Sequence, residues 1–230
     1  MRILLLIIST LCFSVLFGQT KKKIDVDAYY KWKTISSKNI SSKGSVVVYR
    51  EKAYRGNDTL FIHEKNDWNH PIVVGKVDKP SIDFKERFVA FHLVNDYDSV
   101  RKLKLDDVPK KEWKKNTVAI LNLALDTTYK VEKSKKYSLG EEGGDWILIE
   151  RDESFELPKD EIKQRKCFLR KQKKEVEDPL KNKGSILTVV NAKDWSSKDI
   201  EGVTTSAISH FGNGYAYVHT FTYSDSIDSA

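Results

Sequence analysis

The stretch GEEGGDWILIE, residues 140–150, reads as a tight turn that runs directly into a β-strand. Glycine and charged residues favour the turn, and the large apolar residues after it favour the strand. Related segments occur at 40–50, 82–92 and 208–219. Because the pattern recurs at long intervals, we predict a repeat fold built from hairpins. The strand cores are expected to begin at Val46, Phe88, Trp146 and Tyr215.

Each of the first three hairpins is followed by further strand-forming sequence. These second elements lie at 58–65, 116–133 and 184–203. Each unit thus supplies about four short antiparallel strands, which at a period of 40 or more residues is typical of a β-propeller blade. We predict an all-β chain: an incomplete β-propeller of about three and a half blades at 24–230, with units near 29–77, 80–133, 135–203 and 204–230. A β-sandwich, which also has several short strands at even spacing, is the alternative.

Two charged insertions explain why the later hairpins lie further apart than the first two. They occupy 95–115 and 151–183, and each is punctuated by a proline, Pro109 or Pro158. Both are expected between the second and third strands of a blade, as a short helix or a surface excursion. The fourth unit contains only the start of a blade, whereas propellers close with about four to eight blades. We therefore expect a truncated propeller.

The N-terminus has the features of a secretory signal peptide at residues 1–19. Arg2 is basic, and Leu4 to Phe17 is mostly apolar and uncharged. This run is too short for a comfortable membrane span, although an uncleaved anchor is the alternative. Cys12 lies inside the run rather than at its end, which disfavours a lipoprotein. We expect an exported protein, periplasmic or extracellular, with no stable membrane span after cleavage.

The formal net charge is +7, and the run from Lys163 to Lys174 is basic with no acid. Such a run is usually a solvated helix face or loop. Nucleic-acid binding would need interleaved aromatic residues for base stacking, and only Phe168 is present, so we expect no nucleic-acid partner. Cys167 is the one cysteine beyond the signal segment, so we expect no internal disulfide and no nucleophilic role for it.

The sequence shows no catalytic constellation. An α/β-hydrolase nucleophile lies on a G-x-S-x-G elbow, which the glycine-adjacent Ser45 and Ser185 do not fit; both read as turn residues before strands. The histidines lack the spacing of a helical zinc site; they are His63, His70, His92, His210 and His219. His92 and His219 could line a central channel, but a half-exposed histidine at a strand end is the simpler interpretation. We expect no catalytic, cofactor-binding or metal-binding residue.

Acidic pairs and tryptophans are explained by structure rather than by chemistry. Adjacent acids at 106–107, 141–142 and 152–153 could act as acid and base if they met across a cleft, but in turns or insertions they are expected to be solvated. No calcium-loop pattern occurs. Trp146 lies in a strand core, and burial of each tryptophan would contribute about 2–3 kcal/mol.

The order of these elements resembles the propeller of exported bacterial S9 peptidases, the prolyl oligopeptidase family. The stretch YYKWKTISSKNISSKGSVVVYREKAYRGNDTLFIHEK (29–65) resembles a first blade. KPSIDFKERFVAFHLV, DDVPKKEWKKNTVAILNL and KSKKYSLGEEGGDWILIERDE resemble the sequence that follows it. The resemblance runs from about Ile24 to the C-terminus, and the EEGGDW turn is its most distinctive part. It implies a propeller that restricts access to short peptides, followed by an α/β-hydrolase domain that holds the catalytic Ser, Asp and His.

The match ends inside the propeller, so no catalytic residue can be assigned to this chain. We expect a non-catalytic propeller segment that gates substrate access in a parent serine peptidase. Its partners would be the missing α/β-hydrolase domain and the parent enzyme's peptide substrate. The alternative is a stand-alone exported module that binds a partner or a glycan. An independent hydrolase of another class has no motif to support it.

Overall fold

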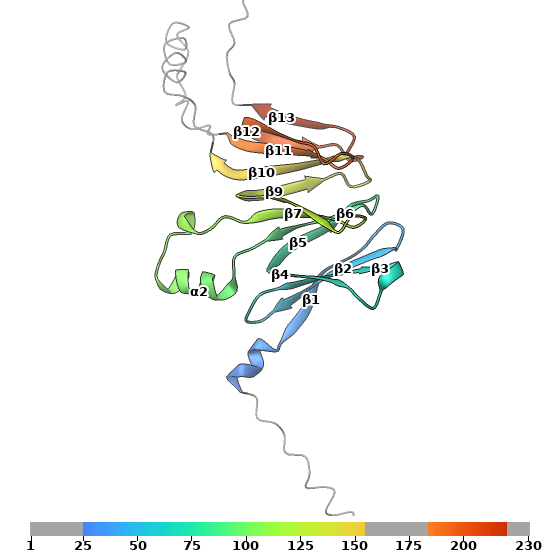
Figure 1. The fold of residues 1–230 in the computed structure, drawn as a ribbon. Helices are drawn as coiled ribbons and strands as arrows, with labels where there is room; N and C mark the ends of the chain where they lie inside the picture. The colour runs from blue at the N-terminus through green and yellow to red at the C-terminus, as the bar shows by residue number, and fades with distance from the viewer. Residues whose placement is uncertain (1–24, 155–183, 220–230) are drawn as a thin grey trace, which may run out of the picture.

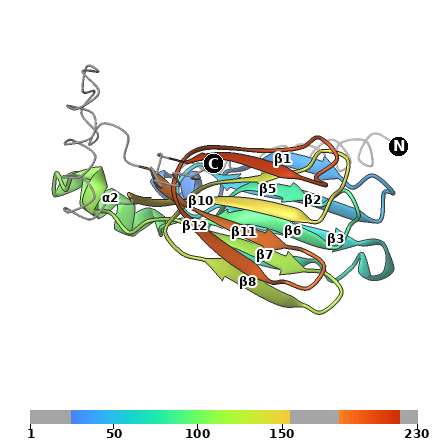
Figure 2. The same cartoon turned by 90° about the horizontal axis from the view of Figure 1, so that it is seen from above.

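The computed structural model describes residues 25–154 and 184–219. The expected signal segment at 1–19 and the basic run at 163–174, with Cys167, lie outside the described residues. The described residues form three antiparallel β-sheets that stack face to face (Figures 1 and 2). No helix among them is both long enough and apolar enough to cross a bilayer.

Consecutive strands pair within each sheet, and the first strand of each sheet lies at one edge. The first sheet comprises β1 (Lys33–Ile40), β2 (Val46–Ala53), β3 (Thr59–Glu64) and β4 (Ile72–Gly75). The second comprises β5 (Val77–Ile82), β6 (Phe88–Leu93), β7 (Thr117–Asn122) and β8 (Thr127–Val131). The third comprises β9 (Ser134–Leu139), β10 (Trp146–Ser154), β11 (Ser185–Asn191), β12 (Ser197–Ile208) and β13 (Tyr215–His219).

The four predicted strand starts are confirmed, because β2, β6, β10 and β13 begin at the expected residues. Three stacked sheets of antiparallel strands form a partial β-propeller, not the two-sheet sandwich. The short one-turn helices are η1 (Val26–Tyr30), η2 (Lys65–Asp67) and η3 (Lys110–Glu112).

Alternation along the strands places apolar side chains between the sheets. In β6, Val89 and Phe91 face the first sheet, whereas Phe88 and Ala90 face the third. Successive side chains of a strand point to opposite faces, so one apolar run serves two cores. All four residues are buried, and burying a large apolar side chain contributes about 1.5–3 kcal/mol.

The chain passes from the last strand of one unit to the first strand of the next through a residue with positive φ. These residues are Lys76 (φ 62°), Lys133 (φ 52°) and Gly202 (φ 70°). At the third junction the strand is not interrupted, so β12 pairs with β11 up to Val203 and from there with β13. The last two strands are thus continuous with the third sheet, although they open a further unit.

The first charged insertion contains a helix, which is one of the two forms predicted for it. α2 (Tyr97–Leu105) lies between β6 and β7, and Asp96 caps it by accepting a hydrogen bond from the Ser99 N–H (3.3 Å). Hydrogen bonds from Asn57, Lys76 and Ser99 lower the pKa of Asp96 to about 2. The second insertion begins later than predicted, because residues 151–154 still belong to β10. Its remainder, 155–183, lies outside the described residues.

Candidate functional site

The turns that join the first and second strands of each unit lie on the side of the stack opposite α2 (Figures 1 and 2). We call this side the hairpin rim; it is formed by 41–45, 83–87, 140–145 and 209–214. Polar contacts link each turn to the next turn along the stack. The rim is therefore the place where charged side chains of different units meet.

Arg87 links the second unit to the third. Its Nε donates to Asp83 Oδ2 (2.7 Å), and its Nη1 donates to Asp145 Oδ1 (2.7 Å). Its Nη2 donates to the Gly144 carbonyl (2.6 Å). Charge-assisted hydrogen bonds of this kind are stronger than neutral ones, so the guanidinium clamps the two turns together.

Asp145 is the centre of this clamp. Lys85 Nζ lies 3.2 Å from its Oδ1, and Lys193 Nζ lies 3.0 Å from its Oδ2. Partial burial opposes ionisation, but hydrogen bonds from Lys193, Arg87 and Lys85 outweigh it and lower the pKa of Asp145 to about 2. A carboxylate held ionised by three cations is unsuited to general acid–base catalysis near neutral pH.

Glu86 links the first unit to the second. It adopts a positive φ of 60° and accepts a hydrogen bond from the Lys43 N–H (2.9 Å) and one from the Ser45 hydroxyl. Hydrogen bonds from Ser41 and Ser45 lower the pKa of Glu86 to about 2. Ser45 is thus a turn residue before β2, as predicted. Ser185, in contrast, is already the first residue of β11.

His210 links the third unit to the last strand pair. Its Nδ1 lies 3.0 Å from Glu141 Oε2, and its Nε2 lies 3.1 Å from Glu142 Oε1. Hydrogen bonding and charge attraction from Glu142, and then from Glu141, raise the pKa of His210. These acids belong to the EEGGDW turn and were expected only to be solvated. No spacing pattern predicts this pair, because Glu141 and His210 are far apart in the chain.

The remaining histidines are scattered. His92 was expected to be half-exposed at a strand end, but it lies inside β6 and is only 5% exposed. Its ring packs against Tyr137 (ring centroids 5.2 Å apart). Its Nδ1 has no hydrogen-bond partner among the described residues. Burial lowers the pKa of His92. His219 ends β13, and its side chain lies outside the description. Over 25–154 and 184–219, no group of three or more His, Cys, Asp or Glu residues could hold a metal ion.

The tryptophans follow the burial prediction only in part. Trp146 contacts Tyr215 (5.2 Å between ring centroids), and Trp195 contacts Phe88 (5.9 Å), both edge to face. Trp32 and Trp68, however, are 47% and 53% exposed, so core burial does not account for them.

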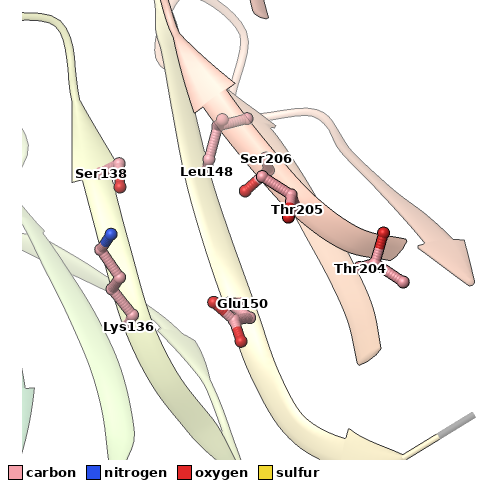
Figure 3. A pocket seen from close by; sticks show the side chains of 7 residues that line it. All are labelled: Lys136, Ser138, Leu148, Glu150, Thr204, Thr205 and Ser206. Carbon is pink, nitrogen blue, oxygen red and sulfur yellow. The ribbon is translucent and has the colours of Figure 1, made fainter. Parts of the chain in front are cut away.

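A polar groove lies beside the inner strands of the third sheet, where β12 begins to pair with β13 (Figure 3). It has a volume of about 170 Å³, and Leu148 is its one apolar lining residue. The other lining side chains are Lys136, Ser138, Glu150, Thr204, Thr205 and Ser206. Hydroxyls, one amine and one carboxylate can hydrogen-bond a polar ligand or chain segment, but Glu150 is already paired with Lys135 (2.9 Å).

A second, wider groove of about 430 Å³ lies between the outer strands of the second and third sheets. Of its lining residues, Arg151 is paired with Asp199 (3.1 Å) and with Glu153 (3.3 Å), and Thr188 also donates to Asp199 (2.7 Å). Arg151 and Asp199 therefore bind each other, which favours a role for this pair and Thr188 in holding β10, β11 and β12 together.

Comparison with known proteins gives fold neighbours only. No family model and no curated protein matches the chain. The β-propeller domain of the trilobed protease from Pyrococcus furiosus matches 76% of this chain and 45% of its own, at 11% identity and a TM-score of 0.42. Pyrococcus horikoshii acylaminoacyl peptidase matches 81% of this chain and 28% of its own, at 10% identity and a TM-score of 0.41. TolB from Acinetobacter baumannii matches 81% of this chain and 38% of its own, at 9% identity and a TM-score of 0.39. The chain thus spans less than half of each of these structures, and a likeness this distant carries no inference about chemistry.

Proposed function

We propose that this chain is a non-catalytic propeller segment of an exported, prolyl oligopeptidase-like serine peptidase, in which it gates access of peptides to the hydrolase domain. The sequence resemblance motivates this assignment, and the stacked blades are compatible with it. The single observation that carries it concerns the EEGGDW turn, which is the most distinctive part of the resemblance.

The EEGGDW turn connects the third unit to both of its neighbours. Asp145 and the Gly144 carbonyl hold Arg87 of the second unit, and Glu141 and Glu142 hold His210 of the last strand pair. The motif thus has a structural duty between blades. A structural role of this kind fits a propeller component, and the charged side chains of this turn are all engaged in ion pairs.

Gating would act through the first strands of the units, β1, β5, β9 and the second half of β12. In a propeller the first strand of each blade lies nearest the central channel. The polar groove of Lys136, Ser138 and Thr204 lies beside these strands, so a passing peptide would meet hydroxyls and a lysine there. The missing α/β-hydrolase domain would supply the nucleophile, the base and the oxyanion hole.

Hydrolysis by the pure chain tests the non-catalytic assignment. We expect no release of p-nitroaniline above the buffer blank from dipeptidyl or prolyl p-nitroanilide substrates, and no labelling by a fluorophosphonate probe that reacts with serine hydrolases. Turnover that co-purifies with the chain and labels it would contradict the assignment. The fluorophosphonate gel serves as the control, because it separates labelling of this chain from labelling of a contaminant.

Two further measurements test the export and parent-enzyme parts. Mass spectrometry of chain recovered from the periplasm or medium should show a mature N-terminus at Thr20. The coding DNA beyond the Ala230 codon should continue, directly or after one frameshift, into further blades and a G-x-S-x-G elbow. Unrelated downstream DNA would favour a stand-alone binding module.

A further inference from the structure

The polar groove between the third unit and the last strand pair corresponds to a site one junction earlier, which Tyr137 fills and which we call the Tyr137 site. Glu150 is the fifth residue of β10, as His92 is the fifth residue of β6. Leu148 and Ala90 are the third residues of the same strands. The cross-strand partners of these residues form two matched pairs, which are Lys136 with Asp78 and Ser138 with Ser81. One wall of the groove thus repeats the wall of the Tyr137 site, position by position.

The opposite side of the site carries a different residue in each junction. Leu139 of β9 packs on the core between the second and third sheets, and Ile208 of β12 packs in the same way on the core that follows. Tyr137 precedes Leu139 by two residues, and Ser206 precedes Ile208 by two residues. Ser206 therefore stands where the earlier junction has a tyrosine.

The Tyr137 site holds a neutral phenol that the chain itself supplies. The ring packs against His92 (ring centroids 5.2 Å apart). The hydroxyl donates to the carbonyl of Lys79 and lies 3.1 Å from the carbonyl oxygen of Ala90. Burial is the main cause that raises the pKa of Tyr137 to about 12. The hydroxyl therefore stays protonated and can donate a hydrogen bond near neutral pH.

With a serine in place of the tyrosine, the polar groove is open. Its volume of about 170 Å³ exceeds that of a cavity of roughly 150 Å³ that holds benzene, so one aromatic ring fits in it. Side chains of β9 and β12 stand on either side of Leu148 and Glu150 (Figure 3). Every lining residue belongs to one of two neighbouring units that the structure describes.

The lining residues suit a ring that carries one hydroxyl. Leu148 and the methyl groups of two threonines offer apolar contact to the ring. The ammonium of Lys136 has no ion pair among the described residues, so it can lie over the face of a ring. Glu150 accepts a hydrogen bond from Lys135 at Oε1 (2.9 Å) and has no other partner in the described ranges. Its Oε2 can therefore accept a hydrogen bond from a phenol.

We propose that the polar groove binds the phenol ring of a ligand, in the way that the earlier junction holds the ring of Tyr137. Tyrosine side chains of peptides and free phenols both carry this group. The ring would lie against Leu148, with its hydroxyl on Glu150. The proposal goes beyond the proposed function, because a peptidase segment and a stand-alone module would have the same groove.

Saturation-transfer difference NMR on the full chain tests the proposal with N-acetyl-tyrosinamide as the probe. We expect saturation of its ring protons with a Kd of about 1 mM. N-acetyl-phenylalaninamide, which lacks the hydroxyl donor, should bind about fivefold more weakly. Weaker binding of p-cresol than of N-acetyl-tyrosinamide assigns the groove to a tyrosine of a peptide, and equal or tighter binding assigns it to a free phenol. No saturation of N-acetyl-tyrosinamide at about 10 mM, or equal binding of the phenylalanine compound, would overturn the proposal.

A tyrosine placed in the chain locates the site. Ser206→Tyr supplies the ring that Tyr137 supplies at the earlier junction, so it should abolish binding of N-acetyl-tyrosinamide. Ala207→Tyr is the matched control, because Ala207 is the next residue of β12, is exposed and does not line the groove. This control should bind the probe like the wild type. If Ser206→Tyr unfolds cooperatively in urea and still binds the probe like the wild type, the probe lies elsewhere and the proposal is wrong.

Removal of the hydroxyl acceptor gives a second test that leaves the groove open. Glu150→Ala should weaken binding of N-acetyl-tyrosinamide by about tenfold, because hydrogen bonds to charged groups are strong. Binding of N-acetyl-phenylalaninamide should not change. Glu153→Ala, in the same strand but outside the groove, is the control. Equal losses for both probes in Glu150→Ala would show that Glu150 does not recognise the hydroxyl, and the assignment to a phenol would fall.

Discussion

Two junctions of the stack have the same arrangement but are stabilised by different interactions. The middle junction lies between the second and third sheets, and the end junction lies between the third sheet and the last strand pair, the second half of β12 with β13. In the middle junction, nine buried residues form the core, and Arg87 and Asp145 pair at the rim with side chains 27% and 16% exposed. In the end junction, five buried residues form the core. At its rim His210 pairs with Glu141 and Glu142, and all three side chains are at least 50% exposed.

The difference shows what a repeat must keep and what it can vary. Both junctions place a cation of one turn against acids of the neighbouring turn. Only the middle junction uses a guanidinium, which stays charged at every physiological pH, whereas the end junction uses an imidazole that titrates. We therefore expect the middle junction to dominate stability and the end junction to respond to pH.

Truncation of a core residue should have the largest effect. Ile149 is fully buried in the middle core, so Ile149→Ala should lower the free energy of unfolding by about 2–5 kcal/mol. Ile208 is only partly buried in the end core, and Ile208→Ala should cost less than half as much. Urea unfolding followed by tryptophan fluorescence measures both. Equal losses would show that the two cores are equally well packed.

A methyl group at Gly212 should disrupt the end junction specifically. Gly212 has a φ of 60°, and an added Cβ would collide with the backbones of Gly143 and Gly144. Gly212→Ala should cost about 1–3 kcal/mol through backbone strain, and more if the turns separate. Gly214→Ala is the matched control, because a Cβ there meets nothing within 4 Å. If both variants have the same urea midpoint, the close approach of the turns does not contribute to stability.

Loss of the Asp145 charge should weaken the middle junction. Asp145→Asn keeps the side-chain shape but leaves Arg87, Lys85 and Lys193 around a neutral amide. Hydrogen bonds to charged groups contribute about 1.5–3 kcal/mol each, and part of this is recovered by solvent, so a total loss of about 1–3 kcal/mol is expected. Glu142→Gln in the exposed pair is the comparison and should change the urea midpoint much less. The reverse order would contradict the ranking of the two junctions.

Local sequence pattern predicted the repeating hairpins but not the contacts between them. The strand starts at Val46 and Phe88 follow from a turn beside a run of apolar residues, which is visible over about ten residues. The contact of Arg87 with Asp145 depends on which turns the stacking brings together. A single sequence carries no spacing rule for such pairs.

Burial shows a related limit of sequence reading. His92 sits among apolar neighbours in FVAFHL, which favours a buried strand, yet its position at the strand end suggested exposure. The structure buries it because the ring of Tyr137 from β9 covers it. That contact crosses between two sheets, so the local pattern could not reveal it.

The smallest effect should be a pH dependence at the end junction. The pKa of His210 is raised above 6.5 in the folded chain, so its pairing with Glu141 and Glu142 stabilises fully below pH 6.5 and is lost as the pH rises through the folded pKa. His92 acts in the opposite sense: its lowered pKa gives stability above pH 6.5 that is lost as the pH falls through the folded pKa. The difference between wild type and His210→Gln cancels the contribution of His92. We expect this difference in urea midpoint to be largest below pH 6.5 and to shrink as the pH rises through the folded pKa of His210. A difference that does not change with pH would show that His210 acts by packing on Phe211 (ring centroids 5.2 Å apart) rather than by its charge.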